Sequence, residues 1–307
     1  MQTDFNFVIR QLRMIFDHLC NKFVEREDVI QGAMLSIIAG QHMLLIGPPG
    51  TAKSAFLKEF CKFIQNIKLY ELLLSKETTP DELLGPFNER EKAYGRYIRL
   101  TANKLPEAHI SILDEIFKAK GETLNSLLNV LNERIFIQNG KPEKVSLIST
   151  FGASNEYPQE VELAALYDRF LIRMETQYIE DEKNLGNMLS GVSNPSLLDE
   201  SSAVLTIENL QALQKRSMMV KLPQRIVQII VRIRMRLFDE GIFPSDRRLK
   251  ASLSILRANA LLAGRNEINE DDLPILTHVL WTDPDEREKL EEILMDTIQY
   301  HYVSHTS

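Results

Sequence analysis

Residues 47–54 read Gly47-Pro48-Pro49-Gly50-Thr51-Ala52-Lys53-Ser54, and this stretch decides the fold. The apolar run Met43–Ile46 precedes it, and an amphipathic helical pattern from Ala55 to Phe63 follows. A buried strand, a glycine-rich turn and a helix in this order form the setting in which such a string binds phosphate. The alternative is a Gly-Pro turn that binds nothing, but so restrictive a string is rare by chance, and rarer directly after an apolar run.

The residue types in this turn have chemical reasons. Gly47 and Gly50 let successive main-chain N–H groups point at one anion, and the start of a helix near Lys53 adds the positive end of its dipole. Lys53 is expected to reach the β- and γ-phosphates, and the Ser54 hydroxyl is placed to bind Mg²⁺. Ala52 stands where glycine is usual, and its methyl group fits if φ is negative there. We therefore expect the turn to bind ATP or ADP with Mg²⁺.

Length and composition limit the possible classes of protein. The chain has 307 residues, which suits two domains better than one. Its formal charge of −7 argues against a broadly basic surface for nucleic acid. Cys20 and Cys61 lie in apolar helical patterns, which indicates buried, reduced thiols typical of the cytosol. Because no apolar run reaches the length of a membrane span and the start lacks a basic signal sequence, we expect a cytoplasmic protein.

A second apolar run ends in two carboxylates. Ile110–Leu113 reads as a central strand, and Asp114 and Glu115 follow at its C-terminal edge, where open α/β sheets bind their ligands. Asp114 would hold Mg²⁺ through water, and Glu115 would orient and deprotonate an attacking water. A strand that ends in two acids is common, so the phosphate-binding turn upstream is what makes this pair specific.

Two further polar residues sit at the ends of predicted elements. Asn155 follows the strand predicted for residues 146–153, where its amide could hydrogen-bond the γ-phosphate or the attacking water, or simply form a turn. Arg169 lies at the end of a helix, ahead of the strand predicted for residues 171–174, and is expected to point away from its own phosphate site. An arginine that completes a neighbour's site must point that way. The alternative is a surface salt bridge with Asp168 or Glu162.

The pattern of elements predicts an α/β nucleotide-binding domain over residues 1–185, a linker over residues 186–203 and an all-helical domain over residues 204–307. The expected helices include residues 5–22, 29–39, 207–219, 223–239, 247–262 and 271–280. Hairpins are expected near Tyr94-Gly95 and at Asn139-Gly140, the second being a strong two-residue turn signal.

One helix of the predicted C-terminal domain begins in an unusual way. Ser245 is a capping residue, and Arg247 and Arg248 then stand in the first turn, where the helix dipole disfavours a cation. An anion that reaches this turn would account for the placement, and a solvated charge is the alternative.

Taken together, these elements resemble the AAA+ ATPases. Gly47–Ser54 matches Walker A, Leu113-Asp114-Glu115 matches Walker B, Asn155 matches sensor 1, Arg169 matches the arginine finger, and Arg247, or alternatively Arg248, matches sensor 2. The two hairpins resemble the helix-2 and pre-sensor-1 hairpins of the MoxR, magnesium-chelatase and minichromosome-maintenance group. Strings such as Gly-Arg-Tyr-x-Arg-Leu-Thr and Leu-Tyr-Asp-Arg-Phe, together with the alanine before the P-loop lysine, are similar to the RavA branch of MoxR proteins.

The resemblance implies a central five-stranded parallel sheet, a smaller helical lid domain and a hexameric ring that binds nucleotide between subunits. One subunit would contribute Lys53, Ser54, Asp114, Glu115 and Asn155, the next would contribute Arg169, and Arg247 could act on the neighbouring site. The implied activity is Mg²⁺-dependent ATP hydrolysis coupled to chaperone-like remodelling of a client protein complex. RavA-type chains usually continue into a partner-binding module, whereas this chain ends at Ser307.

Two other functions stay open. Minichromosome-maintenance relatives use the same hairpins on DNA, but Lys141 and Lys144 stand here beside Glu143 and form no concentrated basic stripe, so a nucleic-acid motor is less favoured. A nucleotide-gated scaffold with negligible turnover is the other alternative, and the intact Glu115 argues against it.

Overall fold

The computed structural model describes residues 5–190 and 205–305, and the chain forms two compact units. One unit comprises Arg10–Ile207, and the other comprises Met1–Ile9 together with Glu208–Ser307. Helix α8 (Glu182–Ser190) covers the first part of the linker predicted for residues 186–203, and the rest of that segment lies outside the described residues. No helix in the described part is long and apolar enough to cross a membrane.

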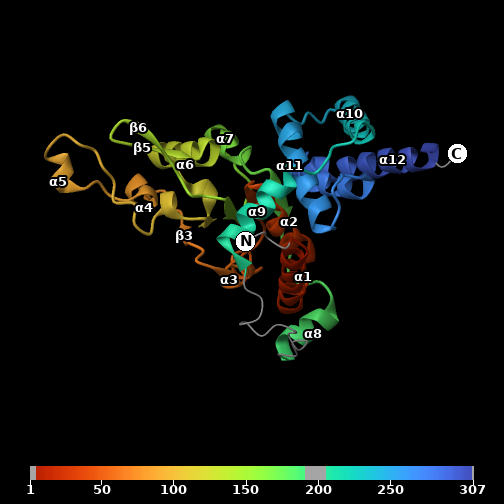
Figure 1. Cartoon of the computed structure of the whole chain (residues 1–307), viewed down its shortest axis with the longest axis horizontal. Coiled ribbons are helices and arrows are strands. Elements are labelled where there is room, and N and C mark those ends of the chain that lie inside the picture. The colour runs from red at the N-terminus through yellow and green to blue at the C-terminus, as the bar shows by residue number, and fades with distance from the viewer. Residues whose placement is uncertain (1–4, 191–204, 306–307) are drawn as a thin grey trace. The chain divides into compact units, whose positions relative to one another are not determined.

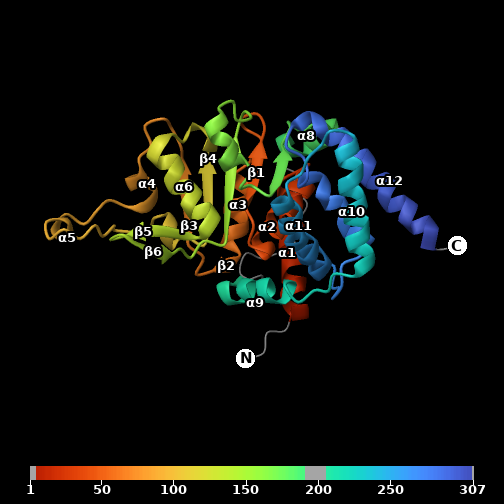
Figure 2. The same cartoon turned by 90° about the horizontal axis from the view of Figure 1, so that it is seen from above.

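The larger unit is built around a parallel sheet whose five strands, within the described residues, follow the order β3-β4-β7-β1-β8. They are β1 (Met43–Ile46), β3 (Leu69–Leu73), β4 (Ile110–Asp114), β7 (Ser149–Ser154) and β8 (Ile172–Glu175). Every residue of β1 and β7 is buried, as is typical of inner strands in a parallel sheet covered on both faces. The predicted α/β fold with a five-stranded parallel sheet is confirmed, and Figure 2 shows helices flanking the strands.

Helices precede and connect these strands. They are α1 (Phe5–Lys22), α2 (Glu27–Ala39), α3 (Ala55–Lys62), α4 (Pro80–Leu84), α5 (Glu89–Lys92), α6 (Gly121–Glu133) and α7 (Ala164–Tyr167), with 3₁₀ turns η1 (Leu105–Glu107), η2 (Ile116–Lys118) and η3 (Val161–Leu163). A capping box begins α4, because the Thr79 N–H donates to the Glu82 carboxylate at 2.9 Å and proline occupies the first turn. A small parallel pair joins β2 (Ile64–Gln65) to β9 (Leu205–Thr206).

The two predicted hairpins meet each other. Strands β5 (Ile135–Gln138) and β6 (Lys141–Lys144) form an antiparallel pair, and the positive φ of Asn139 and Gly140 confirms the two-residue turn. The insertion that carries α5 is less regular, since a single antiparallel bridge, Phe87 to Arg99, closes it among the described residues. The Asn139 N–H donates to the Tyr97 carbonyl at 2.9 Å. Figures 1 and 2 show the two segments side by side at one end of this unit.

The smaller unit is helical, as predicted. Its elements are most of α9 (Ile207–Ser217), α10 (Gln224–Asp239), α11 (Asp246–Leu262), η4 (Glu270–His278), η5 (Pro284–Glu286) and α12 (Arg287–His305). The segment predicted as an α-helix over residues 271–280 is instead 3₁₀, because Pro274 inside it lacks the N–H that an α-helix needs. The fully buried Asp272 fixes this segment through two hydrogen bonds of 2.6 Å from Arg265.

His42 is a fully buried polar residue at the start of β1. Its Nδ1 accepts a hydrogen bond of 2.9 Å from the Thr150 N–H, and its Nε2 lies 3.1 Å from the Leu131 carbonyl oxygen. The proton therefore resides on Nε2, and the ring is neutral. Burial, with a smaller contribution from the nearby Arg134 guanidinium, lowers the pKa of His42 well below its usual value.

We expect this histidine to make the fold sensitive to mild acid. His42 takes up a proton near pH 6.5 in the unfolded chain but not in the folded chain. Its contribution to the free energy of unfolding should therefore be constant above that pH and fall below it. The slope would approach about 1.4 kcal/mol per pH unit. Urea unfolding at pH 7.5, 6.5 and 5.5 measures it. His42→Asn should be less stable at pH 7.5 but show a flatter dependence, and equal slopes in both proteins would contradict this assignment.

Candidate active site

The P loop, residues 47–54, joins β1 to α3 at the carboxyl edge of the sheet. Its first glycine is required by a close approach, because a Cβ at Gly47 would lie 2.1 Å from the Thr176 carbonyl oxygen. The Gly47 N–H donates to the Ser154 carbonyl at 3.1 Å. The Thr51 hydroxyl lies 2.9 Å from the Thr176 hydroxyl and donates to the Pro48 carbonyl at 3.0 Å. These contacts hold the loop over the ends of the inner strands.

Ala52 differs from the expectation. Its φ is +60°, so the condition that the alanine keeps a negative φ is not met. The methyl group is accommodated in the left-handed region, at a cost of roughly 1–2 kcal/mol relative to glycine. Helix α3 begins at Ala55, where the predicted helical pattern starts, with Ser54 as its N-cap residue.

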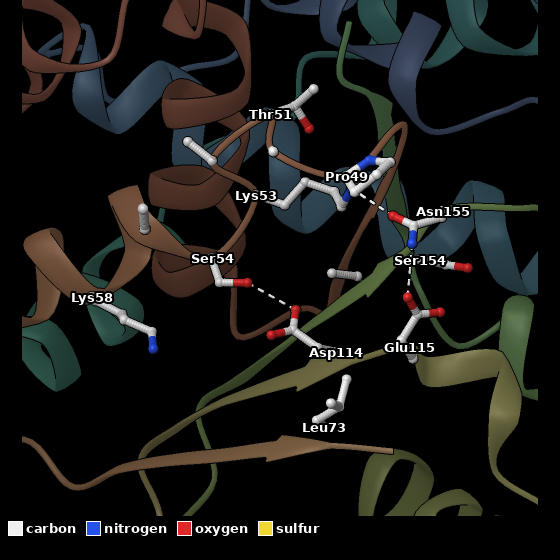
Figure 3. A pocket seen from close by; sticks show the side chains of 14 residues that line it. Pro49, Thr51, Lys53, Ser54, Lys58, Leu73, Asp114, Glu115, Ser154 and Asn155 are labelled. Carbon is white, nitrogen blue, oxygen red and sulfur yellow. Dashed lines mark hydrogen bonds between the residues drawn. The ribbon is translucent and has the colours of Figure 1, made fainter. Parts of the chain in front are cut away.

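A pocket of about 490 Å³ opens above the loop, a size typical of small-molecule sites. Its lining consists of residues 49–55 of the loop and helix start, with Lys58, Leu73, Asp114, Glu115, Ala153, Ser154 and Asn155 (Figure 3). The sheet order explains this lining, because β3, β4 and β7 all end at the same edge as β1.

Lys53 lies between the loop and the end of β7. Its ammonium donates to the carbonyl oxygens of Gly47 at 2.6 Å and Pro48 at 2.8 Å, and to Asn155 Oδ1 at 3.0 Å. Burial lowers the pKa of Lys53, and the nearby carboxylates of Glu115 and Asp114 oppose that shift. The residue is therefore placed to contact the phosphate of a ligand in the pocket.

Two hydrogen bonds join the other predicted residues that line the pocket, and both are visible in Figure 3. The Ser54 hydroxyl donates to Asp114 Oδ1 at 2.8 Å, and Asn155 Nδ2 donates to Glu115 Oε1 at 2.8 Å. Glu115 also lies 3.5 Å from the Lys118 ammonium and has a φ of +55°. A non-glycine residue in this region is strained, and such residues cluster at functional sites.

The donor set suits a magnesium ion better than a transition metal. Ser54 and Asp114 offer a hydroxyl and a carboxylate on one side of the pocket, and no group of three or more His, Cys, Asp or Glu ligands occurs in the described part of the chain. Mg²⁺ takes one or two carboxylates and completes its shell with water and substrate phosphates. The residues present therefore fit this ion.

Arg169 does not line the pocket. Among the residues that the structure describes, it forms no salt bridge with Asp168 or Glu162, and its buried Nε has no hydrogen-bond partner. Asp168 instead lies 3.8 Å from the Arg173 guanidinium. Burial lowers the pKa of Arg169.

The two arginines at the start of α11 differ in environment. The Ser245 hydroxyl caps the helix by accepting the Arg248 N–H at 3.2 Å, as predicted. The Arg248 side chain is only 3% exposed and donates to the Val279 carbonyl at 2.7 Å, so it belongs to the interior of the smaller unit. Arg247 is exposed. Of the two candidates, Arg247 is therefore the one whose side chain lies at the surface.

Sequence reasoning missed Arg26, which precedes α2. This side chain is 8% exposed and donates to three carbonyl oxygens, those of Thr51 at 3.2 Å, Glu25 at 2.6 Å and Gln177 at 2.5 Å. Burial lowers the pKa of Arg26. It thereby anchors the P loop from outside the pocket. No local pattern predicts this role, because its carbonyl partners include residues 25 and 151 positions away.

Two family models match the chain. Residues 10–215 match the model described as the MoxR domain in the MoxR-vWA-beta-propeller ternary systems, and residues 225–294 match the AAA lid domain. These matched ranges correspond to the unit that carries the P loop and to the helical unit. The first match covers more than half of the 307 residues.

Relatives of known sequence also match this chain. "Uncharacterized protein MJ0812" of Methanocaldococcus jannaschii is 39% identical over 279 residues, which are 90% of this chain and 72% of that protein. "Uncharacterized protein MJ0079" of the same organism is 38% identical over 293 residues, 94% of this chain and 75% of that protein. "Structural protein ORF618" of Acidianus two-tailed virus is 27% identical over 213 residues, 66% of this chain and 34% of that protein.

A solved structure shares the fold. The crystal structure of a candidate ATPase from Cytophaga hutchinsonii superposes with a TM-score of 0.75, covering 95% of each chain at 16% identity. At this identity the likeness concerns the fold alone. The match to the MoxR domain, the match to the lid domain and the cluster of P-loop, Asp114, Glu115 and Asn155 side chains lead to one conclusion: this chain belongs to the MoxR family of AAA+ ATPases.

Proposed function

We propose that this protein hydrolyses ATP to ADP with Mg²⁺ and uses the reaction to remodel a protein complex. The observation that carries the first part is the connected set of hydrogen bonds from Lys53 to Asn155 and from Asn155 to Glu115, beside the bond from Ser54 to Asp114. All five side chains line one pocket. Membership of the MoxR family supports the same conclusion.

Each residue has a distinct role in this proposal. The main-chain N–H groups of the P loop and the Lys53 ammonium bind the phosphates. Ser54 and Asp114 hold Mg²⁺, which would stabilise the negative charge that develops on the phosphates. Glu115 orients and deprotonates the attacking water.

Asn155 connects the phosphate site to this base. Its amide bonds both the Lys53 ammonium and the Glu115 carboxylate in the present structure. A γ-phosphate would compete for both donors, the ammonium and the amide Nδ2. Glu115 Oε1 would then be released to accept a proton from water, so that the base becomes available when a triphosphate is bound.

We further propose a ring in which Arg169 completes the site of the next subunit. Arg169 is not part of its own pocket and forms no ion pair within the described residues, which leaves its guanidinium available to an anion. From the family resemblance we also propose that the ring has six subunits and that Arg247 acts on a neighbouring site. The proposed domains are the nucleotide-binding domain at residues 1–185 and the lid at residues 204–307.

The family model also suggests a partner for the protein. The matching family model names a system that also contains a vWA domain, so a vWA-containing protein is the first partner to test. The narrower likeness to the RavA branch stays a prediction.

We place the protein in the cytoplasm because Cys20 and Cys61 are free thiols, and burial raises the pKa of each to about 12, which makes them unreactive.

A nucleic-acid motor is less favoured than a protein remodeller. Arg96 and Arg99 of the insertion pair with Glu91 and Asp81, so part of its positive charge is already neutralised. Binding to DNA would show itself as a steep dependence on salt concentration.

Lys53→Ala should weaken ATP binding by about tenfold to a hundredfold, because a charged hydrogen-bond donor to phosphate is worth about 1.5–3 kcal/mol. Calorimetric titration with ATP and Mg²⁺ measures the change. Lys58→Ala is the matched control, since Lys58 lines the same pocket but pairs with Glu71, and its affinity should change less than about threefold. Unchanged affinity in Lys53→Ala would refute the site.

Glu115→Gln should bind ATP normally and lose about 10²- to 10⁴-fold in turnover, since the amide keeps the shape of the side chain but cannot accept the proton. Phosphate release at saturating ATP measures it. Glu156→Gln, a carboxylate just beyond the pocket lining, serves as the control and should keep its activity. Normal turnover in Glu115→Gln would remove its role as the base.

Mixing two inactive proteins tests the shared site. Arg169→Ala subunits keep an intact P loop, and Lys53→Ala subunits keep an intact arginine. Each alone should be inactive, whereas the mixture should recover part of the wild-type ATPase rate, since some sites combine both intact halves. Light scattering confirms co-assembly. A co-assembled mixture that stays inactive would exclude a site built from two subunits.

A further inference from the structure

Arg173 is a buried charge that the proposed chemistry does not use. It lies in β8 and is 1% exposed, although arginine is almost never fully buried unless it is paired. Its guanidinium lies 3.8 Å from the centroid of the Tyr167 ring, and its Nη2 donates to the Tyr167 carbonyl at 3.2 Å. Nη2 also lies 3.8 Å from Asp168 Oδ1. These contacts all fall on the two residues immediately before Arg169.

The two residues that follow Arg169 in the chain are also held in place. Phe170 is fully buried and fills the space beside Gly152, where an added Cβ would lie 2.9 Å from its ring. The next residue, Leu171, donates its N–H to the His42 carbonyl at 3.1 Å. The main chain on both sides of Arg169 is therefore fixed, while its own guanidinium lacks an ion pair within the described chain.

The Tyr167 ring also packs against the segment that follows Glu115. It lies 6.1 Å from the ring of Phe117 in η2, two residues after Glu115. Both rings are buried. The ring that contacts Arg173 is thus also held by the segment that presents the proposed base.

We propose that Arg173 is a positioning residue for Arg169. Through the Tyr167 ring and the Asp168 carboxylate, it fixes the turn so that the Arg169 guanidinium meets the phosphate bound by the next subunit. This inference rests on the proposed action of Arg169 between subunits. The pair itself contributes little to stability, because Asp168 is 41% exposed and water screens its attraction to Arg173 at 3.8 Å. Catalysis does require accurate placement, since an error of about 1 Å can cost about 10²-fold in rate.

The mixed assembly separates positioning from folding. The donor subunit carries Lys53→Ala and supplies the arginine, and the acceptor carries Arg169→Ala and supplies the P loop. Arg173→Met in the donor should lower the ATPase rate of the mixture by about tenfold or more. The same substitution in the acceptor should change it less than about twofold, because the acceptor contributes no guanidinium, and the Asp168 carboxylate left behind is 41% exposed and stays hydrated.

Tyr167 provides a second pair of variants in case Arg173→Met does not fold. Tyr167→Leu in the donor removes the ring on which Arg173 lies and should reproduce the loss. Tyr167→Phe keeps the ring and should restore the rate to that of the unmodified mixture. Unfolding midpoints and light scattering verify that each variant is folded and assembled.

The outcomes distinguish the two proposals. Equal losses from the donor and the acceptor substitutions would assign Arg173 a structural role, and no loss from either would remove its role altogether. Both results overturn the positioning proposal and leave the shared site intact. If the unmodified mixture is inactive although assembled, the shared site fails, and the positioning role fails with it.

Discussion

The site depends on the close approach between Gly47 and Thr176. Because glycine has no Cβ, the chain leaving β1 can pass against the Thr176 carbonyl, where any other residue would collide at 2.1 Å. The Thr51 and Thr176 hydroxyls then meet at 2.9 Å, and Arg26 binds the Thr51 carbonyl from the other side. With the loop held in this way, Lys53 reaches the end of β7 and Ser54 reaches the end of β4.

This arrangement carries strain at two positions. Ala52 and Glu115 both have φ near +60°, a region that costs a residue with a side chain about 1–3 kcal/mol. The strain persists because the neighbouring strands are buried and pair in register, so the loops at their ends have little freedom to relax. One strained residue lies in the phosphate loop and the other presents the proposed base, which places the strain where the chemistry needs fixed geometry.

Much of the fold and part of the site follow from local sequence, because the signals are short in range. The P loop, Asp114 and Asn155 are each adjacent to a strand that its apolar run predicts, and parallel strands bring their carboxyl ends together. Long-range contacts were not predictable. Arg26 acts through a carbonyl 25 residues away, and the φ of Ala52 depends on the closed loop. The 3₁₀ segment is different, because Pro274 is a local signal against the α-helix expected there.

Strand topology bears on where Arg169 can act. Strands β1 and β8 are parallel and in register from Met43 beside Ile172 to Ile46 beside Glu175. The P loop leaves the carboxyl end of β1, whereas Arg169 stands three residues before the amino end of β8. The length of the strands, about 3.3 Å per residue over four residues, therefore separates Arg169 from the edge that carries its own pocket. If Arg169 completes a phosphate site, as proposed, its place three residues before β8 favours the site of another subunit over its own.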